Sequence, residues 1–494
     1  MSFTRPGGIA DRSFDLLGRS LLQDDGLPFA DALSAEHIAE AFAAEGISFG
    51  EPPVTAKAGQ DDGIVYTMGV TLWAMVSQAI FTGIERSCRA AVQRVAVYYA
   101  LAGRDVSSTN TAGYCRARMK VTEGVVQRLT EGVALRCEES LPDELLWHGF
   151  RPKLVDGTTQ SEPDTEKNQA VYPQPGSQAE GLGFPIMRTV AMTSLTTGLL
   201  LSMAMGPYAG KETGETALFR TLFAKLDSGD LVVTDRYFGG WFMLALLQEL
   251  GIEFVTRLHQ HRKADFDQGE RLGKGDHVTK WAKPERPTWL DQESYDRLPD
   301  QLEVREVQVH VVTPGFRTRS LVVVTSLRDH ELHSSNEIAK LYRRRWTVEL
   351  QIRDIKTTMQ LAILRRKTPE GMRQELWTGL LAYNLVRQSM LQSALASGVH
   401  PHQLSFAATL QMLETTWVLA AVPPMVTISQ RERVLALRIL NGHSHRVANR
   451  PNRVEPRAVK RRPSPIAYLT ELRETARARL IDAQKNLAGQ EQTK

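Results

Sequence analysis

The chain has 494 residues, 42% of them hydrophobic and 23% charged, with a formal net charge of +4. This length exceeds one ordinary hydrophobic core, so two or three domains are expected, and the mild positive charge allows a nucleic-acid partner without requiring one. The three cysteines form no Cys-x-x-Cys pair, which argues against a disulfide framework and a cysteine-based zinc site. We expect a cytoplasmic protein without a signal peptide or a membrane span, because the first residues lack an apolar segment and the long uncharged runs contain polar breaks.

The first part of the chain, residues 1–145, is predicted to be helical. Helices are expected at 35–44, 70–81, 85–102 and 121–140. The segment 109–120 carries Arg116, Arg118 and Lys120, which form a modest basic cluster. Contact with DNA and a simple exposed helix face are equally good interpretations of this cluster.

The pattern changes near residue 150, where strands begin to alternate with helices. We expect strands at 152–156, 189–195, 198–205, 231–235 and 253–258, and helices at 215–226 and 240–250. The second and third strands should form a hairpin. The first strand is predicted to end at Asp156 and the fourth at Asp235, so two acids are expected at one edge of a mixed sheet, where functional sites are commonly built.

Residues 259–330 interrupt this alternation and are interpreted as a mainly β insertion. Its first part, 259–300, is polar and contains Trp281 and Trp289. Two strands are expected after this polar part, at 302–312 and 317–326.

The last part of the chain is predicted to be helical, with apolar helices at 376–395 and 404–422. A basic tail follows, with seven cations and one acid between His443 and Arg462. This tail is predicted to be flexible to residue 465 and helical from there to residue 488.

The most informative segment runs from Tyr342 to Lys356 and is predicted to be one helix. At 100° per residue, Tyr342, Arg345, Glu349 and Lys356 share one face within an arc of about 60°. Asp354 should point away from this face. Apolar residues fill the neighbouring stripe, which is the predicted buried face: Ile338, Leu341, Val348, Ile352, Ile355 and Met359. A carboxylate flanked by two cations and a phenol suits the joint binding of a metal and a phosphate, and a solvated helix with ordinary ion pairs is the alternative.

Three acids, Asp156, Asp235 and Glu349, are thus expected to meet at one end of the sheet. Three carboxylates at close range repel one another and raise one another's pKa, and divalent cations relieve that repulsion. Oxygen ligands select two Mg²⁺ or Mn²⁺ ions over zinc. A pair of such ions can activate an attacking oxygen and stabilise a leaving one, so the predicted chemistry is in-line attack on a phosphodiester.

The same residues resemble a known family. Tyr342, Arg345, Glu349 and Lys356 match the spacing Tyr-x2-Arg-x3-Glu-x6-Lys of the YREK group of insertion-sequence DDE transposases. The segments Leu-Val-Asp-Gly-Thr-Thr around Asp156 and Val-Thr-Asp-Arg-Tyr-Phe around Asp235 are similar to that group's contexts for the first and second acids. The resemblance extends over about residues 65 to 400.

The resemblance implies a role for each of these residues. Asp156, Asp235 and Glu349 would be the catalytic acids and would bind two Mg²⁺ or Mn²⁺ ions. Arg345 and Lys356 would hold DNA phosphates near the cut, and Tyr342 would contact the same terminal phosphate. In relatives, a tryptophan of the β insertion stacks on a flipped base, and Trp281 and Trp289 are the candidates for this role here.

An α+β multidomain fold with an RNase H-like core is also implied. The expected divisions are a helical N-terminal DNA-binding region (1–145), the first part of the core (146–258), the mainly β insertion (259–330), the second part of the core with the glutamate helix (331–400), and a helical C-terminal region with a basic tail (401–494).

The activity implied by the resemblance is cut-and-paste DNA transposition. A water nicks the end of the element, the freed 3′-OH attacks the opposite strand to form a hairpin, and the reopened end joins target DNA. The expected partners are the terminal inverted repeats, the target DNA and a second copy of the chain in a synaptic homodimer. Two rival functions stay open: a metal-dependent DNA nuclease on the same fold, and a non-catalytic DNA-binding repressor derived from a transposase.

Overall fold

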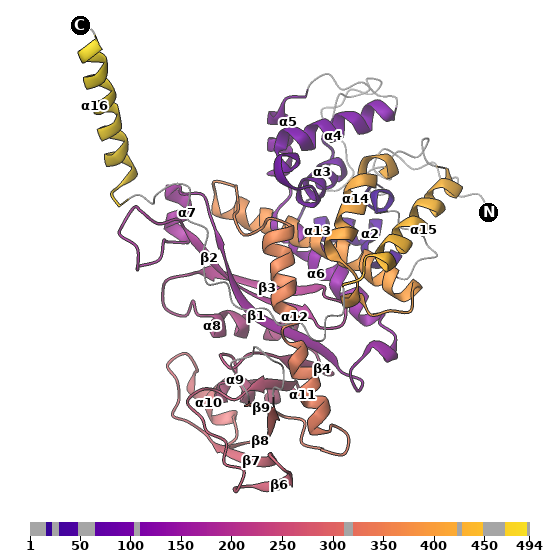
Figure 1. Ribbon diagram of the computed structural model, residues 1–494, viewed down its shortest axis with the longest axis vertical. Coiled ribbons are helices and arrows are strands. Elements are labelled where there is room, and N and C mark those ends of the chain that lie inside the picture. Colours follow the sequence, from indigo (N-terminus) through magenta and orange to yellow (C-terminus); the bar gives the residue numbers. More distant parts are fainter. Residues whose placement is uncertain are drawn as a thin grey trace.

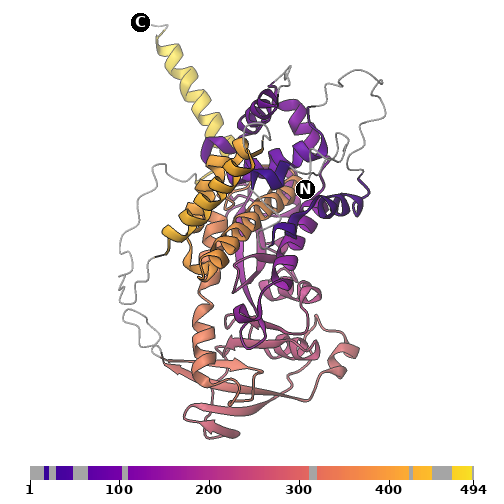
Figure 2. The same ribbon diagram turned by 90° about the vertical axis from the view of Figure 1, so that its right-hand side faces the viewer.

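The fold is a single mixed sheet with helices on both faces. The computed structural model describes residues 16–21, 29–47, 65–102, 109–310, 320–421, 427–447 and 470–491. Within these ranges nine strands form one sheet in the order β3-β2-β1-β4-β5-β9-β8-β7-β6. The N-terminal helices lie at one end of the molecule and strands β6–β9 at the other (Figures 1 and 2). The predicted α+β class is confirmed.

Short helices build the N-terminal part. They are η1 (Ala30–Leu33), α2 (Ala35–Ala43), α3 (Met68–Ile80), η2 (Gly83–Arg86), α4 (Cys88–Leu101), α5 (Thr111–Arg118), α6 (Glu123–Glu139) and η3 (Asp143–Leu145). Hydroxyl side chains cap the N-termini of four of them, because Ser34, Thr67, Ser87 and Thr122 each accept a first-turn N–H. The apolar faces of these helices form one core with the later helices α13 and α14.

Five strands form the central part of the sheet. They are β1 (Arg151–Ser161), β2 (Ile186–Ser194), β3 (Leu200–Pro207), β4 (Asp230–Val233) and β5 (Glu253–Arg257), accompanied by α7 (Glu166–Val171), α8 (Glu215–Thr221), η4 (Phe223–Lys225) and α9 (Trp241–Glu249). β1, β2 and β3 are antiparallel neighbours, whereas β4 and β5 run parallel to β1. This order and these directions are those of the RNase H-like fold expected from the sequence.

The insertion extends the same sheet instead of forming a second one. It contains β6 (Glu270–Gly273), β7 (Asp276–Ala282), α10 (Gln292–Arg297), β8 (Gln301–His310) and β9 (Ser320–Thr325). β9 pairs with β5, so the sheet continues without interruption from the core into the insertion. The sequence interpretation missed β6 and β7, since both lie in the polar segment 259–300.

Alternation along the strands assigns side chains to the two faces of the sheet. Leu154 and Val233 pack in the core under the segment that contains Tyr342 and Val348. Val155, one residue further along β1, packs in the opposite core with α8 and α9. Because side chains two residues apart on a strand share a face, Asp156 lies on the Leu154 face.

The segment expected to be one helix is divided into three pieces. α11 (Ser335–Arg344) and α12 (Thr347–Arg353) are separated by a turn, and a π-helical turn, η5 (Asp354–Thr358), follows directly. The two α-helices run almost in line (Figure 1). The predicted apolar stripe is buried, apart from the partly buried Ile352. A single-turn π-helix is often associated with functional sites, and this one carries Lys356.

Helices complete the chain. They are α13 (Pro369–Ala396), η6 (Pro401–Gln403), α14 (Phe406–Ala421), α15 (Ile428–Ser444) and α16 (Arg473–Glu491). The sequence interpretation missed α15, and most of the expected flexible segment lies outside the described residues. None of the helices in the described ranges is long and apolar enough to cross a bilayer.

Candidate active site

The two aspartates meet because of the register between β1 and β4. Leu154 pairs with Val233 in a parallel ladder, so the positions two residues further on, Asp156 and Asp235, lie at the same level. The prediction that Asp156 ends its strand was wrong, because β1 continues to Ser161 along β2. β4 ends at Val233, and this leaves Asp156 beside the open end of its neighbour.

Backbone and hydroxyl donors fix both aspartates. Asp156 Oδ1 accepts the N–H of Gly157 at 2.8 Å. Asp235 Oδ1 accepts the N–H of Tyr237 at 2.8 Å, which closes a tight turn after β4. The Thr256 hydroxyl donates to the carbonyl of Asp235 at 2.8 Å and so connects this turn to β5. Each carboxylate therefore has one oxygen held in place.

Arg345 connects the first acid to the third. Its Nη1 lies 3.8 Å from Asp156 Oδ2, and its Nη2 donates to Glu349 Oε1 at 3.2 Å. The guanidinium is mostly buried, with the arginine 9% exposed. Its Nε has no hydrogen-bond partner in the described structure, so one buried donor is available to a ligand such as a phosphate oxygen.

Lys356 and Tyr342 complete this cluster. Lys356 donates from Nζ to the hydroxyl of Thr158 at 3.0 Å. Thr158 lies two residues after Asp156 and therefore on the same face of β1. Burial raises the pKa of the Tyr342 phenol, and Arg345 opposes that shift. The residues of the signature thus gather on the face of the sheet that carries Asp156, although the segment is not one helix.

The electrostatics of Asp156 reflect the meeting of three acids. Burial is the largest cause that raises its pKa, to about 6, and the nearby charges of Asp235 and Glu349 add to the rise. Arg345 and the N–H of Gly157 act in the opposite direction. A carboxyl in this setting is stabilised in its charged form by a cation, which Arg345 supplies in part.

The donor set fits a hard divalent cation. Asp156, Asp235 and Glu349 offer only carboxylate oxygens, which Mg²⁺ and Mn²⁺ prefer. Arg345 already acts as a stand-in cation between two of them. In the described part of the chain, however, no three histidine, cysteine or acidic side chains are close enough to hold a metal without moving.

The two tryptophans of the insertion lie away from these acids. Trp281 is buried on the opposite face of the sheet, where its indole N–H donates to Glu306 at 2.9 Å. Trp289 packs against the same core, and the Arg220 guanidinium lies 3.8 Å from its ring centroid. Base stacking by Trp281 or Trp289 stays a prediction.

Sequence reasoning missed a buried ion pair behind the π-helical turn. Asp354 points away from Glu349, as predicted, and its Oδ2 accepts Arg387 Nη2 of α13 at 2.9 Å. Arg387 Nε also donates to the Tyr383 hydroxyl at 2.9 Å, and that hydroxyl donates to the carbonyl of Gly198 at 2.8 Å. The turn that presents Lys356 is therefore anchored to α13 and to the β2–β3 turn. The sequence contained no signal that paired residues 33 positions apart.

A second buried acid lies just beyond β1 and lacks such a partner. Glu162 is 1% exposed, and neither carboxylate oxygen has a hydrogen-bond partner in the described structure. Burial raises its pKa to about 8, against a smaller opposing effect of Arg373. Because the pKa is raised on folding, the stability that Glu162 contributes is fully present below its unfolded value and is lost as the pH rises through about 8.

We therefore expect Glu162→Gln to flatten the pH dependence of stability. At pH 9 the variant should be more stable than the wild type by on the order of 3 kcal/mol, and the difference should disappear near pH 4. Urea unfolding between pH 4 and pH 9 measures this. The exposed Glu166 provides the matched control, Glu166→Gln, which should follow the wild type. Parallel pH curves for wild type and Glu162→Gln would contradict the argument.

Comparison with known proteins identifies the relatives of this chain. The family model described as "Transposase DDE domain" matches residues 147–385. The chain is 29% identical over 356 residues to "Transposase InsG for insertion sequence element IS4" of Escherichia coli (strain K12), over 70% of this chain and 76% of the relative. It is 26% identical over 139 residues to "Putative transposase InsZ" of the same organism, over 28% of this chain and 45% of the relative. A solved structure of a piggyBac transposase synaptic complex with hairpin DNA overlaps 85% of this chain and 84% of its own, with a TM-score of 0.41 and 12% identity.

Proposed function

We propose that the chain is a DDE transposase, because residues 147–385 match the transposase DDE domain, and that Asp156, Asp235 and Glu349 are its catalytic acids. The protein is a DNA-cutting and strand-transfer enzyme related to the transposase of an IS4 element. The observation that supports the three acids most directly is the guanidinium of Arg345, which contacts Asp156 and Glu349 at the level of Asp235.

DDE transposase domains are metal-dependent, and we propose that these three carboxylates hold two Mg²⁺ or Mn²⁺ ions. When bound, the ions would activate the attacking oxygen and stabilise the leaving oxygen. Gly157 and Tyr237 hold one oxygen of each aspartate through their N–H groups, so the other oxygen of each is oriented for a ligand. Arg345 would then shift from the acids to the substrate.

The cations of the signature would bind the scissile phosphate. Arg345 offers a buried Nε donor that lacks a protein partner, and Lys356 offers an ammonium group on the same face. A guanidinium and an ammonium both complement phosphate charge, and the buried setting of the Arg345 guanidinium strengthens its attraction. Tyr342 would contact the same terminal phosphate, as the family pattern implies.

We propose cut-and-paste transposition through a DNA hairpin. A water would hydrolyse one strand at the element end and release a 3′-OH, which would attack the opposite strand. After the hairpin is reopened, the 3′-OH would join target DNA. Two copies of the chain would hold two terminal inverted repeats together, with the N-terminal helices on DNA and the C-terminal region between the copies. A DNA substrate implies work in the cytoplasm, on the nucleoid.

The test uses purified protein, Mg²⁺ or Mn²⁺, and labelled DNA that spans each end of its own element. Denaturing gels should show nicks at the element end first, then hairpins, then joined products. Cleavage without hairpins or joining in either metal would favour the nuclease. Binding without cleavage in either metal would favour the repressor.

The contact between Lys356 and Thr158 leads to a prediction for Lys356→Gln. Loss of the ammonium group should slow nicking and joining by on the order of 10²-fold, because a positioned donor to the phosphate is removed. Affinity for DNA should change much less, since many other phosphates remain bound. Lys340→Gln, at an exposed position in α11, is the matched control and should keep the wild-type rate. Equal rates for both variants would exclude the proposed role of Lys356.

A further inference from the structure

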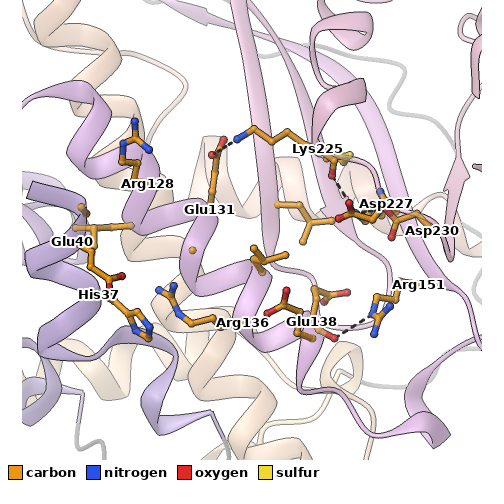
Figure 3. Close-up of a pocket in the computed structure, with 18 of the residues that line it drawn as sticks. His37, Glu40, Arg128, Glu131, Arg136, Glu138, Arg151, Lys225, Asp227 and Asp230 are labelled. Carbon is orange, nitrogen blue, oxygen red and sulfur yellow. Dashed lines mark hydrogen bonds and ion pairs between the residues drawn. The ribbon is translucent and has the colours of Figure 1, made fainter. Parts of the chain in front are cut away.

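Two pockets of the molecule are lined by many charged side chains. One, of ≈ 750 Å³, lies at the start of β1 and β4, away from the acids. Its two lysines are paired within the protein: Lys225 contacts Glu131 at 3.0 Å (Figure 3), and Lys153 contacts Asp230 at 2.5 Å. In all, five arginines and lysines of its lining face six acids, so this pocket has little net attraction for an anion.

The second pocket has ≈ 1060 Å³ and is lined by α3–α6, the start of α13 and the segment between η5 and α13. We name it the cationic pocket after five of its lining residues: Arg86, Arg118, Arg365, Arg366 and Lys367. Across the described residues, none of these five has a carboxylate within 4.0 Å. Arg86 instead donates to the carbonyl of Met359, and Arg366 donates to the side chain of Gln374.

Four carboxylates line the cationic pocket; three of them have partners within the protein, and the fourth, Glu370, is exposed. Glu123 pairs with Arg373 at 2.6 Å, and Glu45 contacts Arg128 at 3.2 Å. Glu375 accepts the backbone N–H groups of the residues at 365 and 366, at 2.9 and 3.0 Å. Its charge offsets part of the repulsion among the arginines. The guanidinium groups therefore outnumber the acids that are free to neutralise them.

Burial makes this imbalance costly. Arg86 is 4% exposed, and burial lowers its pKa. The pKa of Arg366 is lowered to about 10, first by burial and then by the charge of Arg118. An unpaired charge out of water is unfavourable, and an incoming anion removes that penalty.

Three helices also direct their N-termini into the cationic pocket. The first turns of α4, α6 and α13 contribute Cys88, Gly124 and Gly371 to its lining. Helix N-termini carry partial positive charge and backbone donors, and they favour phosphate groups. The helix N-termini and the cationic side chains therefore both attract an anion to this pocket.

We infer that the cationic pocket binds a backbone phosphodiester of the element DNA, an inference that rests on the proposed function for its choice of ligand. The pocket adjoins the catalytic segment, because Arg86 contacts the carbonyl of Met359 and the N–H of Gly83 donates to Gln360 at 3.2 Å. Both partners follow the π-helical turn that presents Lys356. DNA anchored in the pocket is held at a fixed position relative to that turn.

The experiment measures DNA binding as a function of salt, without a divalent metal. Fluorescence anisotropy would use labelled duplexes that cover both ends of the element. The double variant Arg365→Gln/Lys367→Gln changes two exposed side chains and leaves intact the contacts of Arg86 with the carbonyl of Met359 and of Arg366 with Gln374. We expect the slope of log affinity against log salt to become shallower by about 1, because the pocket loses its contact with one phosphate.

Two arginines of α5 distinguish a contact made in the pocket from the general attraction of a positively charged surface for DNA. Arg118 lines the pocket, whereas Arg116 is exposed on the same helix and does not. Arg118→Gln should reduce the slope by about 1 and Arg116→Gln should not. Equal effects of Arg116→Gln and Arg118→Gln would overturn the assignment. Ethylation of single DNA phosphates should weaken binding of the wild type when one particular phosphate is modified. Ethylation of that same phosphate should have no effect on binding of the Arg365→Gln/Lys367→Gln variant.

Inorganic phosphate distinguishes a small-anion site from a DNA site. Inorganic phosphate alone could raise the melting temperature of the wild type but not of the double variant, while the two proteins show the same salt dependence of DNA binding. That result would overturn the DNA assignment. Because the readout is binding, it does not depend on catalysis. A protein that fails to cut DNA but shows the expected slopes would refute the proposed function and keep this inference.

Discussion

Replacing Asp235 by alanine or asparagine should abolish nicking and joining, with a loss on the order of 10³-fold or more. Asp235 lies level with Asp156, and the fold keeps it in place through the N–H of Tyr237 and the hydroxyl of Thr256. Asparagine retains an acceptor for Tyr237 and so tests the charge of the carboxylate separately from its shape. DNA affinity without metal should stay equal or rise, because one negative charge near the phosphates is lost.

The control variant changes an acid that precedes β4, the strand that leads to Asp235. Asp227 is exposed near the start of β4, and Asp227→Asn should leave the rates unchanged. Single-turnover gels with labelled element ends, run beside anisotropy measurements of binding, give both quantities. Residual nicking by Asp235→Asn within tenfold of the wild type would remove Asp235 from the catalytic set.

Loss of Arg387 should produce the largest change in stability, about 3–5 kcal/mol for Arg387→Gln. The substitution leaves Asp354, itself 8% exposed, without its partner at 2.9 Å. Burial already raises the pKa of Asp354 and Arg387 opposes that rise, so removal of Arg387 should raise it further. The deficit should therefore be largest at high pH and should shrink as Asp354 becomes protonated.

Urea unfolding at pH 8 and pH 5 measures the loss, and two further variants establish its cause. Asp354→Asn/Arg387→Gln removes both charges and should recover at least half of the stability. Arg353 faces the same carboxylate at 3.9 Å but is exposed, so Arg353→Gln should cost less than about 1 kcal/mol. The ion-pair argument is falsified if the double variant is no more stable than Arg387→Gln alone.

The central fold was predictable because its signals are local. The apolar strands around Leu154 and Val233 and the hairpin between them have short, distinct patterns, and their order pointed to a mixed sheet with two acids on it. The apolar stripe that ends at Met359 was correct for the same reason, since burial along a helix follows a period of 3.6 residues. The grouping of the signature residues followed from that stripe.

The remaining features depend on contacts that are distant in the sequence. β6 is a polar strand at the edge of the sheet, and its neighbour β7 buries polar side chains such as His277, so alternation of apolar residues does not reveal either strand. The break between α11 and α12 and the π-helical turn depend on packing against β1 and α13, as the contact between Lys356 and Thr158 illustrates. The cationic pocket could not be predicted either, because its residues come from segments more than 200 positions apart.

The continuity of the sheet through β9 also protects the protein against aggregation. Without the insertion, β5 would be an open edge with unpaired backbone groups, and such an edge recruits strands from other molecules. In the full chain β9 covers β5 from Val255 to Arg257. The outermost strand on this side of the sheet is then β6, which is only four residues long and carries Glu270 and Arg271. A shortened enzyme without its insertion would therefore be prone to self-association even if its acids were correctly arranged.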